Sequence, residues 1–186
     1  AMDEFISHLL NEKSYQGLIE RKILLMSDEE GAISIIENKL FEASKIYPNQ
    51  ILNILSEFYF KQQKYHLSIQ TKKEWTSEGN KDFNEWIKFA NDLRIEGQYQ
   101  YAIDAYYFVL SYKLNSKLTE RALLGLGQTY DDQITTKKAM YLIPYFYNNN
   151  MFFKDPFQVY SSISTKHLES SLNLYDSLLV SLKKPS

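Results

Sequence analysis

The sequence contains no cysteine, and only six of its 186 residues are glycine and four are proline. Without cysteine the chain forms no disulfide, offers no thiolate nucleophile and builds no cysteine-rich zinc site. Few glycines and prolines leave few positions for turns, so most of the chain must lie in long elements joined by short connections. These absences favour an all-helical fold.

The chain also lacks a strong charge of either sign and a long apolar run. Its 21 basic and 23 acidic residues give a net charge of −2, without the basic surplus that a nucleic-acid-binding domain normally carries. No stretch approaches the roughly 18 apolar residues of a membrane span. We therefore expect a soluble protein with no nucleic-acid partner and no membrane insertion. The sequence leaves the compartment open, with the cytoplasm favoured over the periplasm.

Motifs that carry chemistry are sparse as well. The histidines His8, His66 and His167 are scattered, and none has a second ligand at a spacing that places both on one helix face. Gly125-x-Gly127 lacks the third glycine of a phosphate loop, and Gly127 is better explained as a small packing residue. There is no nucleophile with a base, no convincing carboxylate pair and no cofactor fingerprint. We therefore expect neither enzyme activity nor a metal or cofactor.

What the sequence does contain is a repeat at an offset of 34 residues, the difference between Tyr99 and Tyr65. Residues of similar size and polarity recur at this offset in residues 49–109. The matching pairs are Tyr65 and Tyr99, Leu52 and Trp86, Leu55 and Phe89, Ser56 and Ala90, Tyr59 and Leu93, Ser68 and Ala102, and Trp75 and Val109. A repeat of this length is typical of stacked helical hairpins.

Residues 83–109 carry the repeat pattern most clearly. Large and small side chains follow helical spacing on both sides of "EGQYQYAI", in which Gly97 can adopt the left-handed conformation that ends a helix. Ala90 and Ala102 occupy the two small positions. This pattern resembles the tetratricopeptide repeat (TPR) family. The resemblance implies an all-α fold, a right-handed superhelical solenoid of antiparallel helix hairpins that holds another molecule.

We predict one domain over residues 3–183, with hairpins at about 15–47, 49–80, 83–116 and 120–147; residues 1–2 are interpreted as a cloning remnant. The second hairpin is a degenerate copy, with Gln63 in place of the turn glycine and Lys72 in place of an aromatic residue. The motif restarts at Ala122, where Gly127 follows Ala90 by 37 residues instead of 34. About three residues are therefore inserted before the last hairpin.

A helix over about 156–183 is predicted to cap the last repeat. Asp155-Pro156 has the chemistry of a helix start, and Pro144 should kink or end the helix before it. A stripe at alternating four- and three-residue steps predicts one buried seam. The stripe consists of Leu168, Leu172, Tyr175, Leu179 and Leu182. The alternative is that this stripe is a self-association surface of a homo-oligomer.

Two further segments leave alternatives open. Asp131-Asp132 follows Tyr130 near a predicted helix end, and such a pair is either a solvated turn or a site for a cation or a basic partner. The aromatic segment from Tyr145 to Phe153 either folds back under the C-terminal helix or forms a binding lip for an apolar or peptide ligand.

The TPR resemblance also implies where a partner binds. Members of this family commonly hold an extended peptide or a partner helix on the concave surface that the first helices of the hairpins make. The matching positions here are Asn53, Glu57, Phe60, Lys61, Ile87, Asn91, Arg94, Arg121, Gln128 and Asp131. We expect Asn91 and Arg94 to bind the partner, because an amide can bond both edges of a peptide group and a guanidinium can grip a carboxylate. The alternative is that these polar residues are simply solvated.

The leading hypothesis is therefore a non-catalytic protein–protein interaction module that holds a peptide or partner segment on its concave face. The chaperone-tail clamp of some relatives is not expected, because Asn53 and Glu57 stand where it requires a lysine and an asparagine. One alternative is the peptide-sensing domain of a transcription regulator, which predicts an upstream helix-turn-helix domain. Another is a structural subunit of an envelope or secretion assembly, which predicts an export signal or lipid anchor before residue 1.

Overall fold

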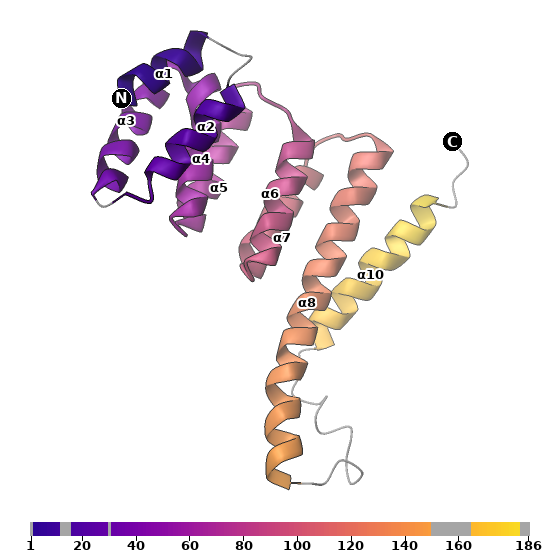
Figure 1. Cartoon of the computed structure of the whole chain (residues 1–186). Coiled ribbons are helices and arrows are strands. Elements are labelled where there is room, and N and C mark those ends of the chain that lie inside the picture. The colour runs from indigo at the N-terminus through magenta and orange to yellow at the C-terminus, as the bar shows by residue number, and fades with distance from the viewer. Residues whose placement is uncertain (1, 12–15, 30, 150–164, 183–186) are drawn as a thin grey trace. The chain divides into compact units, whose positions relative to one another are not determined.

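The computed structural model describes residues 2–11, 16–29, 31–149 and 165–182 (Figure 1). These ranges are mostly helical and contain no strand, which confirms the all-α prediction. The chain divides into two compact units, Ala1–Asp82 and Phe83–Ser186. Across the described ranges, no helix is long and apolar enough to cross a membrane.

The first unit contains α1 (Met2–Asn11), α2 (Gln16–Met26), α3 (Ala32–Ile46), α4 (Pro48–Lys61) and α5 (Tyr65–Ser77). Helix α1 packs against α2 and α3, while α4 packs against α2, α3 and α5. The buried core of this unit consists of Met2, Leu9, Ile19, Ile23, Ile36, Leu40, Ile51, Ile54, Leu55, Phe58 and Tyr59. The predicted hairpin over 15–47 is thus part of a larger group, because α1 supplies two of these core residues.

The second unit contains α6 (Phe83–Ile95), α7 (Tyr99–Leu110), α8 (Ser116–Asn149) and α10 (Thr165–Leu182). Helix α8 packs against α6, α7 and α10, and α7 packs against α6. Trp86 is fully buried at the centre of an aromatic group. Its ring centroid lies 4.5 Å from that of Phe108 and 5.8 Å from that of Phe89. The contact with Phe108 joins α6 to α7, whereas Phe89 lies on α6 itself.

The turns of α4–α5 and α6–α7 have the same geometry at the predicted 34-residue offset. Gly97 has φ 71° and Gln63 has φ 57°, so both residues adopt the left-handed conformation. The next amide closes each turn over the same span, from Lys64 N to Tyr59 O (2.9 Å) and from Gln98 N to Leu93 O (2.8 Å). Gln63 therefore fulfils the role of a C-terminal glycine, at the energetic cost of a left-handed residue that carries a Cβ.

The two hairpins also place small residues at their helix crossing. In α6–α7 these residues are Ala90 and Ala102, both fully buried. In α4–α5 they are Ser56 and Ser68, also fully buried. Each serine hydroxyl donates to the backbone carbonyl of the other serine, at 2.9 and 2.8 Å. The buried hydroxyls are thus satisfied, which allows serine to replace alanine there.

The predicted hairpin over 120–147 is wrong, because α8 runs as one helix of 34 residues. Pro144 lies within this helix and does not end it. Between Tyr130 and Pro144 the sequence "DDQITTKKAMYLI" has no glycine or asparagine that could end a helix. The antiparallel neighbour of α8 is instead α10, which follows later in the chain.

The predicted buried seam of α10 is also wrong at Leu172 and Leu179, whose residues are each 54% exposed. Among the described side chains of this helix, Ser171 and Leu178 are buried, at 1% and 8% exposure, and Tyr175 lies between them against α8. The face of α10 that packs against α8 therefore includes Ser171 and Tyr175, which both bond to Asp131. Some predictions fall outside the described part of the chain. These are the helix start at 155–156, the aromatic segment, and the seam positions Leu168 and Leu182. The undescribed parts concerned are the side chains of residues 134–149, 168 and 182 and all of residues 150–164.

Candidate functional site

The predicted binding residues fall in both units. Asn53, Glu57, Phe60 and Lys61 lie on α4 of the first unit, whereas the remaining residues lie on α6 and α8 of the second unit. These remaining residues are Ile87, Asn91, Arg94, Arg121, Gln128 and Asp131.

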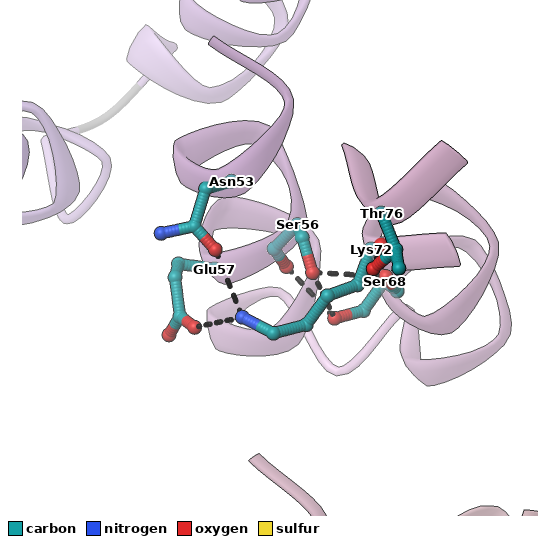
Figure 2. Close-up of polar contacts among 6 residues, drawn as sticks. All are labelled: Asn53, Ser56, Glu57, Ser68, Lys72 and Thr76. Atoms are coloured by element: carbon teal, nitrogen blue, oxygen red, sulfur yellow. Dashed lines mark hydrogen bonds and ion pairs between the residues drawn. The ribbon is translucent and has the colours of Figure 1, made fainter. Parts of the chain in front are cut away.

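The centre of α4–α5 is a polar network around a buried lysine (Figure 2). Lys72 is 0% exposed, and its Nζ lies 2.9 Å from Asn53 Oδ1 and 3.4 Å from Glu57 Oε1. The same nitrogen lies 5.6 Å from the centroid of the Trp75 ring. Burying an ammonium group costs several kcal/mol unless other groups compensate it. Asn53 and Glu57 therefore stabilise Lys72, and both remain partly exposed.

Lys61 connects α4 to α2. Its Nζ lies 2.7 Å from Asp28 Oδ1 and also donates to the backbone carbonyl of Leu24. That carbonyl belongs to the last turn of α2, where a cation is favourable. Lys61 thus has a structural role, although 32% of its side chain remains exposed.

The centre of α6–α7 has a neutral polar pair. The hydroxyl of the fully buried Tyr106 donates to Asn91 Oδ1 at 2.7 Å. Burial raises the pKa of Tyr106 from 10.0 to about 12, so the hydroxyl keeps its proton at neutral pH. Because the carbonyl oxygen of Asn91 accepts this bond, its amide nitrogen remains the group that can donate to a partner. Ile87 on the same helix is 1% exposed and offers little surface.

These two polar pairs occupy equivalent positions. Lys72 and Tyr106 are 34 residues apart, and so are Glu57 and Asn91. In each hairpin a buried residue of the second helix donates to a partly exposed residue of the first helix. The sequence indicated Lys72 as a departure from the repeat but did not predict its contacts. The signal was present, because a lysine in place of a buried aromatic residue requires acceptors on the facing helix.

Both predicted arginines have partners within the second unit. Arg94 Nη1 lies 2.7 Å from Asp132 Oδ2, and Arg121 Nη1 lies 2.6 Å from Asn84 Oδ1. Within the described part of the chain, Arg94 Nε is buried without a hydrogen-bond partner. Asp132 therefore holds the guanidinium group of Arg94 through Nη1, and 22% of the arginine side chain is exposed.

The acidic pair on α8 joins that helix to its neighbours. Asp131 accepts hydrogen bonds from Ser171 Oγ and Tyr175 OH of α10, both at 2.6 Å, while Asp132 pairs with Arg94. Burial and then the hydrogen bond to Asp131 raise the pKa of Tyr175 to about 12. The pair thus connects α8 to α10 and α6 and is not a solvated turn. In the described ranges, no group of acidic or histidine side chains could hold a metal ion.

Close packing at two glycines accompanies these contacts. A Cβ at Gly127 would lie 2.9 Å from the ring of Tyr175, and a Cβ at Gly125 would overlap the ring of Tyr106. The prediction that Gly127 is a small packing residue agrees with this contact, whereas the role of Gly125 was not predicted. Gln128, the remaining predicted residue, is partly buried on the same helix.

Comparisons of the chain with protein-family models, curated proteins and solved structures find no match. The resemblance to the TPR family therefore rests on the residues and contacts described above.

Proposed function

We propose that the protein is a non-catalytic interaction module of the TPR type, a right-handed solenoid that holds an extended peptide or partner segment along its first helices. Three features at the 34-residue offset support this proposal. They are the left-handed turn residues Gln63 and Gly97, the small residues at the helix crossing, and the cross-helix bonds that Lys72 and Tyr106 donate. Such repeats generally present a surface for binding.

The bond from Tyr106 to Asn91 is the observation that carries the peptide-binding part of the proposal. It engages the carbonyl oxygen of a partly exposed asparagine and leaves the amide nitrogen as the group that can donate to a partner. An oriented donor reduces the ordering cost when a peptide carbonyl binds. Arg94, one turn further along α6, can add a donor toward the same segment.

The test should remove the donor of Asn91 without removing the acceptor that Tyr106 needs. Asn91→Ala would leave the Tyr106 hydroxyl without its acceptor, so a loss of binding would be hard to separate from a loss of stability. Asn91→Asp keeps an oxygen for Tyr106 and removes the NH₂ group. Asn38→Asp makes the same chemical change at an exposed position of α3, which the proposal does not use.

We would select a displayed library of random peptides, each about 12 residues long and mostly extended when bound, against the wild-type protein. Affinities of the selected peptides would then be measured for all three proteins. We expect Asn91→Asp to bind about tenfold more weakly, equivalent to about 1.4 kcal/mol, and Asn38→Asp to bind like the wild type. Failure of the wild type to select any peptide, or equal binding by Asn91→Asp, would overturn the proposal.

A further inference from the structure

The chain uses a different side chain at one position of its two equivalent hairpins. Helix α7 has Tyr106 there, and α5 has Lys72, which is equally buried. A neutral aromatic donor would satisfy the same geometry without bringing a charge into the core. Lysine adds a cation at a site where desolvation is costly, and this cation lies against the first-helix residues Asn53 and Glu57.

Lys72 fixes the orientation of both neighbours. It occupies the carbonyl oxygen of Asn53 and one carboxylate oxygen of Glu57. Figure 2 shows the amide nitrogen of Asn53 and the second oxygen of Glu57 on the side away from Lys72. The α4 surface therefore has one oriented donor and one oriented acceptor, four residues apart on one helix face.

We propose that Lys72 is a positioning and specificity-determining residue, which presets Asn53 and Glu57 to bind an uncharged residue of an extended peptide. The inference deepens the proposed function and rests on it. In an extended chain the N–H and C=O groups of one residue point to the same side, as in an antiparallel ladder, where a facing pair exchanges both bonds. Asn53 donates to this carbonyl, and Glu57 accepts from this N–H.

The charge of Lys72 sets the preference for an uncharged ligand. Glu57 has 34% of its side chain exposed, so an uncompensated carboxylate there would attract basic peptides. The ammonium group beside it offsets that field. Lys72 thus contributes through Asn53 and Glu57 without itself contacting the ligand, because it is 0% exposed.

The experiment exchanges charges while keeping the cross-helix bond. Lys72→Tyr introduces the residue of α7 and leaves Glu57 uncompensated. Glu57→Gln keeps an acceptor for Lys72 and leaves the cation uncompensated. The double variant Lys72→Tyr/Glu57→Asn copies the neutral pair of α6–α7. Each folded variant and the wild type would be tested with the same random peptide library.

We expect Lys72→Tyr to bind a basic version of a selected peptide about two- to fivefold more tightly than the neutral version, as exposed charge pairs contribute. Glu57→Gln should prefer an acidic version by a similar factor, and the double variant should show neither preference. Circular dichroism would confirm folding, and Glu57→Gln provides the test if Lys72→Tyr does not fold.

Two failures can be told apart. If the wild type selects peptides but no variant changes the charge preference, Lys72 is only structural and this inference is wrong, while the proposed function stands. If the wild type selects no peptides, the proposed function and this inference both fail.

Discussion

The hairpins α4–α5 and α6–α7 have the same turn, helix crossing and cross-helix bond but use different residue types at these positions. Both close with a left-handed turn residue, cross at two small residues and bond a buried second-helix donor to the first helix. One hairpin uses glutamine, serines and a lysine–glutamate pair at these places. The other uses glycine, alanines and a tyrosine–asparagine pair. The backbone positions are therefore shared, whereas the residue types at them are free to change as long as each buried polar group has a partner.

The two pairs also differ in what their burial costs the fold. Neutral groups at the centre of α6–α7 satisfy the fold with little desolvation cost, whereas the buried lysine of α4–α5 makes its hairpin dependent on Asn53 and Glu57. Under the proposal above, Lys72 is the residue that sets the charge preference of this surface.

Truncation of the first-helix acceptor should affect the charged hairpin most. Glu57→Ala removes a carboxylate from the fully buried Lys72 and should cost about 3 kcal/mol, because breaking a buried pair leaves a poorly compensated charge. Asn91→Ala removes the acceptor of a neutral hydroxyl and should cost about 1–2 kcal/mol. Urea unfolding of each variant measures both values. Equal costs would contradict the contrast between the pairs.

A methyl group at Gly125 should destabilise the second unit by about 1–3 kcal/mol, because the added Cβ would overlap the Tyr106 ring. Gly17→Ala in α2 is the matched control, since nothing lies within 4 Å of a Cβ there. That change should stabilise the helix by about 0.5–1 kcal/mol. Thermal unfolding would show shifts of the melting temperature of opposite sign. An unchanged melting temperature for Gly125→Ala would argue against the close packing of α7 and α8.

Exchange of the turn residues should change the stability of the two hairpins in opposite directions. Gln63→Gly relieves a left-handed residue and should stabilise α4–α5 by about 1 kcal/mol. Gly97→Gln introduces the same strain in α6–α7 and should cost about 1–2 kcal/mol. Amide hydrogen exchange of each hairpin reports the local effect. Destabilisation by Gln63→Gly would mean that the glutamine side chain supports the turn.

The second unit should lose stability at alkaline pH. Its Tyr106 and Tyr175 have pKa values raised to about 12, above the usual 10.0 of the unfolded chain. Their contribution is therefore complete below about pH 10 and is lost as the pH rises toward 12. Urea unfolding at about pH 9 and pH 11 should show a smaller loss for Tyr106→Phe than for the wild type. An unchanged pH dependence would exclude a contribution from that phenol.

The serine pair should show the smallest effect. Ser56→Ala and Ser68→Ala together copy the alanines of α6–α7 and remove both donors, so the double variant should remain within about 0.5 kcal/mol of the wild type. Denaturant unfolding of the single and double variants completes the comparison. A loss of several kcal/mol would indicate that the hydroxyls do more than satisfy each other.

Local residue patterns were sufficient for much of the helical structure. The offset between Gly97 and Gln63 predicted two turns, and the positions of Ala90 and Ala102 predicted the helix crossing. Long-range pairing was not accessible in the same way. No local signal connects Asp131 with Ser171 and Tyr175, which lie about 40 residues further along the chain.

The 34-residue offset predicted which residues of α4 and α6 are equivalent, but not the internal partners of these residues. Matching α4 and α6 predicted that Glu57 and Asn91 are equivalent, and they bond to equivalent residues. The prediction took these side chains as exposed groups, although a lysine at position 72 in place of a buried aromatic residue already indicated that the facing helix must supply acceptors. Lys61 and Arg121 illustrate the same point, since each has an internal partner that its exposed helix position does not reveal.

Double-mutant cycles in the two hairpins measure the energy of each cross-helix bond. One cycle combines Lys72→Met with Glu57→Ala, and the other combines Tyr106→Phe with Asn91→Ala, with unfolding free energies measured for all variants. We predict a coupling energy of about 1 kcal/mol or more in each cycle, larger for the charged pair. A coupling below about 0.3 kcal/mol in either cycle would contradict the claim that equivalent cross-helix bonds organise both hairpins.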